Sequence, residues 1–253
     1  GVVFIVLSVT NVREAIFNSI PMNLKKAVSV GIGFFIAFIG LQNAKIVVGG
    51  ATLVQLFSLD EVEGATMNDA GICVLLAIIG VFITAILVLK EVKGNILWGI
   101  LITWLLGIIC QFTGLYVPNA EIGYYSLLPD FSAGLSIPSL APIFMKLDFT
   151  AIPIAEFVVI IFAFLFVDIF DTLGTLIGVA SKADMLDEEG RLPRIKGALM
   201  ADAVATTAGA VMGTSTTTTF VESASGVTEG GRTGLTSMTT AILFLLSLLL
   251  SPV

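Results

Sequence analysis

Long apolar runs, broken by short polar stretches, dominate the pattern of this chain. A helix that crosses about 30 Å of hydrocarbon at about 1.5 Å per residue needs about 20 mostly apolar residues. Seven runs are candidates, the first as the tail of a crossing: Val2–Val9, Ala27–Val48, Gly71–Leu89, Asn95–Cys110, Ile154–Ala180, Ala198–Met212 and Leu235–Leu250. The pattern predicts an all-α membrane protein with several crossings.

Composition supports the membrane class and argues against others. Of 253 residues, 57% are hydrophobic and 12% charged, too few charges for a soluble surface and too apolar for disorder. A net charge of −7 without a basic stripe argues against nucleic acid as a partner. Histidine is absent, and Cys73 and Cys110 lie inside apolar runs, so we expect no metal, disulfide framework or cofactor. The chain starts within an apolar stretch, and we expect a piece of a longer protein.

The basic residues indicate an orientation. If the stretch after the first run is cytoplasmic, alternation leaves only Lys45 and Lys146 outside, the sense of the positive-inside rule. The alternation requires an extra crossing between Met212 and Arg232. The other ten basic residues fall inside: Arg13, Lys25, Lys26, Lys90, Lys93, Lys182, Arg191, Arg194, Lys196 and Arg232.

The longest connection, residues 111–153, holds five of the eight prolines. Because proline cannot continue a helix, this stretch predicts an outside loop between two helical groups.

Acidic residues interrupt the run Ile154–Ala180 near its middle. Asp168, Asp171, Thr172 and Thr175 are spaced to share one helical face, and charged groups within a crossing are functional candidates by default. Gly174 and Gly178 have the small-xxx-small spacing that allows close helix approach. The structural alternative is that these carboxylates only pair with Lys or Arg near a helix end.

A second feature is the threonine-rich segment Gly213–Gly226, which contains four consecutive threonines and then Glu222. Threonine favours extended backbone, and non-helical backbone at membrane depth is tolerated where it is buried or lines a cavity. We therefore expect a discontinuous crossing, extended over 214–220, with a half-helix starting near 221–223. The alternative is a continuous Ser/Thr-rich helix.

Asp202 lies near the expected start of a helix, where a carboxylate complements the helix dipole. A structural role is therefore favoured for Asp202.

Three stretches carry a family resemblance: Phe166–Ala180, Leu192–Asp202 and Gly213–Gly234. They resemble the adenine/guanine/hypoxanthine permeases, the AzgA-like branch of the nucleobase–cation symporter-2 (xanthine–uracil permease) superfamily. Ile20–Lys25 and Gly31–Asn43 add to the similarity, which covers essentially the whole chain.

The resemblance implies an architecture. It is a uracil-permease-like fold of two inverted repeats of seven crossings, divided into core and gate domains, with a short strand near 214–220. Residues 1–10 would end crossing 4, and 24–112 would form gate crossings 5–7. Residues 113–153 would be an extracytoplasmic loop and 154–253 core crossings 8–11, with crossings 1–3 and 12–14 outside the chain.

The resemblance also implies a function and a site. The implied protein is a multi-pass protein of the cell (plasma or inner) membrane that imports hypoxanthine, guanine or adenine by proton symport. Sodium is the alternative coupling ion, and a homodimer is a candidate assembly. Asp168 and Glu222 match substrate-binding carboxylates of crossings 8 and 10. Phe220, Val221 and Thr172 match further positions that contact the substrate. Asp171, together with Asp168, matches positions linked to proton coupling.

Two other functions compete with purine transport. An anion carrier of the related sulfate-permease fold is disfavoured because two carboxylates would repel an anion and no cavity cation is evident from the sequence. An intramembrane aspartyl protease needs aspartates on different helices, one in a Gly-x-Gly-Asp setting, whereas Asp168 and Asp171 share one run and that motif is absent.

Overall fold

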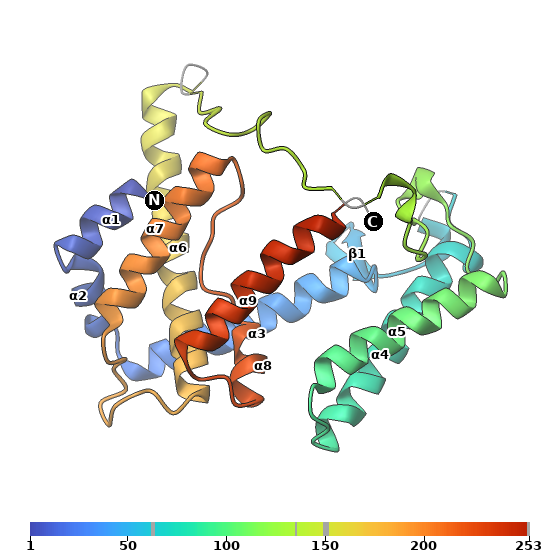
Figure 1. The fold of residues 1–253 in the computed structure, drawn as a ribbon, viewed down its shortest axis with the longest axis horizontal. Coiled ribbons are helices and arrows are strands. Elements are labelled where there is room, and N and C mark those ends of the chain that lie inside the picture. The colour runs from blue at the N-terminus through green and yellow to red at the C-terminus, as the bar shows by residue number, and fades with distance from the viewer. Residues whose placement is uncertain (62–63, 135, 149–151, 252–253) are drawn as a thin grey trace. The chain divides into compact units, whose positions relative to one another are not determined.

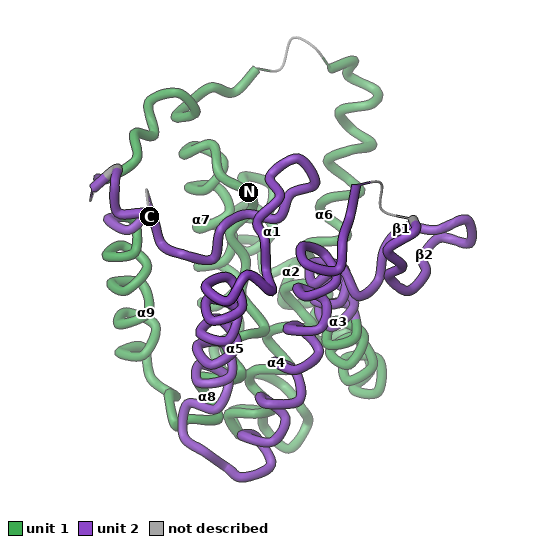
Figure 2. Tube along the Cα trace, turned by 90° about the vertical axis from the view of Figure 1, so that its right-hand side faces the viewer, with its two compact units in different colours: residues 1–34, 137–248 green, residues 35–136, 249–253 purple. Residues whose placement is uncertain are grey.

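The structure is a computed structural model that describes residues 1–61, 64–134, 136–148 and 152–251. The chain forms two compact units, which Figure 2 shows in separate colours. Unit 1 comprises residues 1–34 and 137–248, and unit 2 comprises residues 35–136 and 249–253. Both units are mostly helical, as the pattern of apolar runs predicts.

Unit 1 consists of helices from both ends of the sequence (Figure 1). Helices α1 and α2 pack against α7, and α6 packs against α8. The helices are α1 (Val2–Val9), α2 (Val12–Ser19), the first part of α3 (Met22–Asn43), α6 (Ile154–Lys182), α7 (Ile195–Met212), α8 (Ser223–Thr228) and α9 (Gly234–Ser247), which continues as a 3₁₀ turn (Leu248–Leu250).

The first two helices were not expected as a pair. The chain bends by 77° between α1 and α2, where Asn11 adopts a left-handed conformation with φ of 61°, one that asparagine tolerates better than most residues. Together, the two helices are long and apolar enough to form one broken crossing.

The core of unit 1 lies around the second half of α6. Leu173 and Ile177 of α6 pack with Phe17 of α2 and with Ile195 and Leu199 of α7, and each of the five is at most 5% exposed. Such a buried apolar cluster is a main source of stabilisation because it removes apolar surface from water. It holds the second half of α6 between α2 and α7.

The small-residue spacing on α6 marks a close approach, as predicted. A Cβ added at position 174 would lie 2.8 Å from Cγ1 of Val28, and one at position 178 would lie 2.6 Å from Oγ of Ser29. Both neighbours belong to α3, so Gly174 and Gly178 let the side chains of α3 press onto the backbone of α6.

Unit 2 contains a hairpin and a pair of long helices. Strands β1 (Val47–Gly50) and β2 (Leu53–Leu56) are antiparallel, with Val47 opposite Leu56 and Gly50 opposite Leu53. The helices are α4 (Ile72–Leu89), preceded by a π turn (Met67–Gly71), and α5 (Asn95–Phe112), with 3₁₀ turns at Leu59–Glu61, Ala120–Ile122 and Phe131–Ala133. The expected run Ala27–Val48 was too long, because α3 ends at Asn43 and β-branched Val47 and Val48 begin the hairpin.

Helices α4 and α5 pack through reciprocal glycine and threonine contacts. A Cβ at position 80 would lie 2.8 Å from Cγ2 of Thr103, and one at position 99 would lie 2.9 Å from Cβ of Thr84. Each helix therefore offers a glycine to the threonine of the other. The small-xxx-small spacing that we noted on α6 recurs here as Gly80-xxx-Thr84 and Gly99-xxx-Thr103.

The proline-rich stretch after α5 is a loop, as expected, and it is tied to α5. Trp104 donates from Nε1 to the carbonyl of Leu127 over 3.0 Å, and the Leu127 amide donates to Oε1 of Gln111 over 2.9 Å. The buried Tyr116 donates its hydroxyl to the carbonyl of Tyr125 over 2.6 Å, and burial raises the pKa of Tyr116 to about 12. Residues 113–127 thus form an ordered cover on the end of α5.

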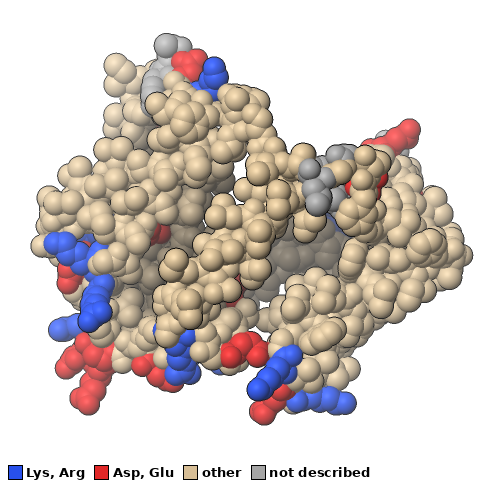
Figure 3. Space-filling model, viewed as in Figure 1, with Lys and Arg blue, Asp and Glu red and all other residues tan. Residues whose placement is uncertain are grey.

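Four helical segments in the described ranges are long and apolar enough to cross a membrane: Met22–Asn43, Met67–Leu89, Asn95–Phe112 and Ile195–Met212. The α1–α2 pair adds a fifth if counted as one crossing. In the space-filling view, charged side chains gather toward the ends of the helices and leave their sides largely uncharged (Figure 3). This distribution fits helices surrounded by lipid.

Candidate functional site

The acidic face of α6 lies at the middle of the longest helix in the described ranges. Fourteen residues of α6 precede Asp168 (154–167) and fourteen follow it (169–182). Asp168 is half-buried, and its Oδ2 is buried without a hydrogen-bond partner among the described residues. Thr172 and Thr175 continue the same face and are 0% and 1% exposed, while Asp171 is half-buried. The predicted polar face therefore points into unit 1.

The threonine-rich segment interrupts the helices, as predicted. Helix α7 ends at Met212, Gly213 adopts φ of 76°, and helical structure resumes only at Ser223. Figure 1 shows this trace descending from α7 to α8 without helical turns. We call residues 213–222 the break. No strand is assigned within residues 214–220, all of which the structure describes. A strand needs a hydrogen-bonded partner strand, and the described residues supply none to this segment, so the short strand stays a prediction.

Hydrogen bonds tie the break back onto α7. Thr206 donates its hydroxyl to the carbonyl of Thr217 over 3.0 Å, and the amide of Thr214 donates to the carbonyl of Gly209 over 3.0 Å. Gly209 makes this approach feasible, because a Cβ there would lie 2.9 Å from Oγ1 of Thr217 and 3.2 Å from the carbonyl oxygen of Ser215. The break is therefore held against α7 by contacts that need a residue without a side chain.

The remaining candidate residues lie at the end of the break. Phe220 is 58% exposed, Val221 is half-buried, and Glu222 is exposed at the N-cap of α8 without a side-chain capping bond. The first amides of α8 already donate to carbonyls three residues back. In the break, the amides of residues 215–222 make no backbone hydrogen bond to a described residue, and those of residues 220–222 lie next to α8 in the sequence.

The structure brings α6 and the break together at one pair of threonines. The Oγ1 atoms of Thr172 and Thr218 are 3.3 Å apart. No hydrogen bond joins Asp168 or Asp171 to Phe220, Val221 or Glu222, all of which lie in described ranges.

Arg13 and Asp202 are the charged residues of this region that sequence reasoning missed or undervalued. Nη2 of Arg13, from α2, lies 3.0 Å from Oδ2 of Asp202, on α7, and the two side chains are 2% and 1% exposed. Nη1 of Arg13 donates to the carbonyl of Leu199 over 3.0 Å. Thr172 donates to the same Oδ2 of Asp202 over 3.3 Å. Arg13 was expected in a cytoplasmic loop and Asp202 only at a helix start, so the pair adds a buried cation to the acidic face.

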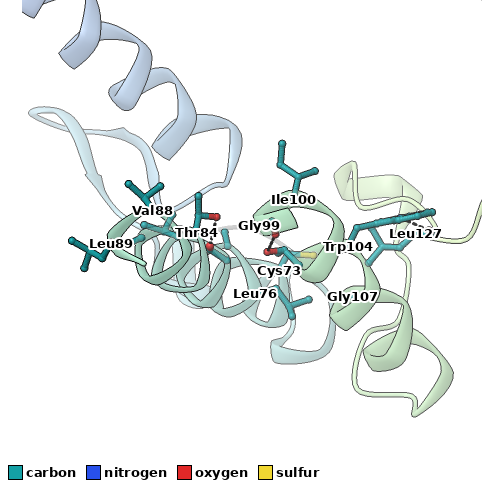
Figure 4. Close-up of a pocket in the computed structure, with 15 residues that line it drawn as sticks. Cys73, Leu76, Thr84, Val88, Leu89, Gly99, Ile100, Trp104, Gly107 and Leu127 are labelled. Carbon is teal, nitrogen blue, oxygen red and sulfur yellow. Dashed lines mark hydrogen bonds between the residues drawn. The ribbon is translucent and has the colours of Figure 1, made fainter. Parts of the chain in front are cut away.

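The cavity of unit 2 differs in character from this polar region. It is a groove of about 880 Å³ along α4 and α5, and its lining is almost wholly apolar apart from Thr84, Thr103 and Cys73. Thr84 donates its hydroxyl to the carbonyl of Gly80 (Figure 4), and Thr103 donates its hydroxyl to the carbonyl of Gly99, so both hydroxyl protons are used within their own helices. Such a surface offers a polar substrate little to bind.

Several apolar helices, one of them interrupted beside buried acidic groups, define a polytopic membrane protein of the transporter class. The chain belongs to the Permease family, whose model (Xan_ur_permease) matches residues 1–253. It is 47% identical to a permease-family protein of Methanocaldococcus jannaschii, over 100% of this chain and 53% of that protein.

Two further relatives carry substrate names. The guanine/hypoxanthine permease PbuG of Bacillus subtilis is 41% identical over 100% of this chain and 52% of its own length. The adenine permease AdeP of Escherichia coli is 35% identical over 98% of this chain and 50% of its own length. The chain thus spans about half the length of these relatives. The resemblance drawn from the sequence is confirmed at the level of the family: the chain belongs to a family of membrane permeases.

Proposed function

We propose that the full-length protein is a secondary active transporter that imports purine nucleobases by proton symport. The observation that carries the proposal is the contact of a non-helical segment with the acidic face of α6, through Thr218 and Thr172. The names of the relatives support the substrate class, since two are guanine/hypoxanthine and adenine permeases. The proposal includes the inverted-repeat fold, with 24–112 in the gate domain and 154–253 in the core domain, and a homodimeric assembly.

The residues at the break and on α6 have the chemistry that a purine requires. A purine is a flat ring with N–H donors and N or O acceptors on its edges. Asp168 and Glu222 can accept from its N–H groups, and the amides of residues 220–222 can donate to its acceptors. Phe220, with an exposed ring, can stack on its face. Val221 follows Phe220 in the sequence, and Thr172 offers a further hydroxyl on α6.

The coupling proton would bind on α6. Oδ2 of Asp168 is buried and has no hydrogen-bond partner among the described residues. A proton there would neutralise the carboxyl group and turn the oxygen into a donor. Asp171, one turn away and half-buried, is the second candidate carrier. Neutralisation would let the loaded core domain move against the gate domain without carrying an uncompensated charge.

The anion-carrier alternative gains a cation but remains disfavoured. Arg13 is buried in unit 1, contrary to the sequence-based expectation that this region holds no cation. Its charge is compensated by Asp202 at 3.0 Å. Asp168 and Asp171 still give the face a negative character, which repels an anion.

Uptake of labelled hypoxanthine by cells that lack their own purine permeases tests the proposal. We expect Asp168→Asn and Glu222→Gln in the full-length protein to reduce uptake to background at normal membrane abundance. Asp184→Asn is the matched control, because that carboxylate is 83% exposed. Near-normal uptake in both site variants would remove these residues from the site.

Separate measurements test the substrate class and the coupling ion. Competition by guanine and adenine, with none by sulfate, supports purine transport, and the reverse result would refute it. Proton symport predicts that a protonophore stops uptake and that replacing sodium does not.

A further inference from the structure

Arg13 is held from three directions. Its two terminal nitrogens donate to Asp202 and to the carbonyl of Leu199, both on α7, over 3.0 Å each. Its guanidinium carbon lies 4.2 Å from the centre of the Phe4 ring on α1. This arrangement uses the planar, forked shape of guanidinium, which lysine cannot reproduce. The contacts therefore specify arginine rather than any positive charge.

The hydrogen bonds that continue from this pair have a fixed direction. An ionised carboxylate only accepts, so Thr172 must donate its single hydroxyl proton to Oδ2 of Asp202. Thr172 can then only accept in its contact with Thr218, and Thr218 must donate. The carboxylate of Asp202, held by Arg13 at 3.0 Å, thus sets the orientation of a hydroxyl in the break, two residues before Phe220.

We propose that Arg13 is a positioning residue for transport, acting through Asp202, Thr172 and Thr218 to hold the break against α6. The inference rests on the proposed function for its uptake readout. Arg13 touches no candidate substrate-binding residue itself. Its effect passes through four elements: α2, α7, α6 and the break.

The decisive variants keep charge while breaking the chain of contacts. Arg13→Lys retains a cation but loses the fork, and Thr218→Val removes the last donor. We expect each, in the full-length protein, to raise KM for hypoxanthine about five- to tenfold, as loss of one such hydrogen bond would. Because both act through the same contact, the double variant should be no worse than the more severe single variant.

An exposed ion pair between two described residues provides the matched control. Arg232 and Asp184 are 3.6 Å apart, and their side chains are 48% and 83% exposed. Arg232→Lys should leave KM unchanged. If Arg13 serves only to stabilise the fold, Arg13→Lys would lower the amount of protein in the membrane without changing KM, or its effect on KM would multiply with that of Thr218→Val. Either result would overturn the inference.

A second readout does not depend on purine transport. With Thr219→Cys in a background lacking other reactive cysteines, labelling by a membrane-permeant maleimide reports how firmly the break is held. We expect Arg13→Lys to speed labelling severalfold, and an unchanged rate would contradict the inference. Failure of the wild-type protein to take up purines would refute the proposed function alone, and labelling would still decide the role of Arg13. If Arg13→Lys does not reach the membrane, the double variant Arg13→Gln/Asp202→Asn replaces it in the uptake and the labelling measurements. This double variant removes both charges together.

Discussion

Threonine hydroxyls lie at helix contacts in both units, but their hydrogen bonds differ. In unit 2, Thr84 donates to the carbonyl of Gly80 over 2.8 Å, and Thr103 donates to the carbonyl of Gly99 over 2.7 Å. Each hydroxyl is satisfied by its own helix, one turn back. The contact between α4 and α5 can therefore be tight while leaving no polar group in need of a partner.

In unit 1, Thr172 and Thr206 instead use their hydroxyls in bonds between elements. Thr172 contacts Asp202 on α7 and Thr218 in the break. Buried oxygens of Thr175, Asp168 and Asp202 have no hydrogen-bond partner among the described residues. Buried polar atoms are rarely left unpaired. Hydroxyls that bond within their own helix therefore mark a packing contact. Hydroxyls that bond between elements, together with unpaired buried oxygens, mark a region suited to bind a substrate and to move.

The largest effect should come from forcing the break away from α7. Gly209→Leu would clash with Thr217 and with the carbonyl of Ser215. Overpacking of this kind costs about 1–3 kcal/mol, and we expect hypoxanthine uptake to be lost at normal membrane abundance. Gly197→Leu, on the same helix with no atom within 4 Å of its Cβ position, is the control and should transport normally. Equal uptake by the two variants would show that the close contact is irrelevant.

A comparable clash in unit 2 should affect stability more than substrate affinity. Gly99→Leu would press on Thr84 and separate α4 from α5, again at about 1–3 kcal/mol. We expect a lower Tm in detergent and an unchanged KM. Gly40→Leu on α3, where nothing lies within 4 Å, should alter neither. A raised KM in Gly99→Leu would place unit 2 in substrate binding and break the comparison.

Removing one hydroxyl from each unit sharpens the difference. Thr172→Val takes away a donor to Asp202 and an acceptor for Thr218, each bond contributing about 0.5–1.5 kcal/mol. We expect KM for hypoxanthine to rise several-fold. Thr84→Val loses only a bond to its own helix and should stay within about 0.5 kcal/mol of wild type in stability. Equal kinetic effects of the two substitutions would argue against the distinction.

The smallest effect belongs to the exposed ion pair. Arg232→Gln separates a pair 3.6 Å apart on the surface, and exposed pairs contribute about 0–1 kcal/mol. Tm in detergent should therefore change little, and the small difference should shrink further in high salt. A large fall in Tm would mean that this pair, like Arg13 and Asp202, is buried in the full-length protein.

Sequence patterns could predict the features that depend on neighbouring residues. The apolar runs locate the helices, the spacing of Asp168, Thr172 and Thr175 gives the buried polar face, and the run of threonines after Gly213 indicates the break. Each follows from local backbone preference or helical periodicity. The resemblance to permeases identified the family, and the match to the family model confirms it.

Other features depend on contacts that no local pattern contains. Arg13 and Asp202 are 189 residues apart in sequence, so only the fold brings them together, and a charge count assigns Arg13 to solvent. The β1–β2 hairpin was missed because Val47 and Val48 read as the end of an apolar helix. The bend between α1 and α2 depends on the left-handed backbone of Asn11. Asparagine also adopts ordinary conformations, so the residue type alone does not predict the bend.

The central place of Asp168 in α6 has an electrical consequence. Fourteen residues on either side put it about 21 Å from each end of the helix. If α6 crosses the bilayer, as its sequence predicts, and the proposed coupling proton binds there, that proton would traverse roughly half of the transmembrane voltage. Each 100 mV would then contribute roughly 1 kcal/mol to its arrival, half of the full value for one elementary charge. The resting potential of the cell would thus help to load this carboxylate from one side and oppose its release back to that side.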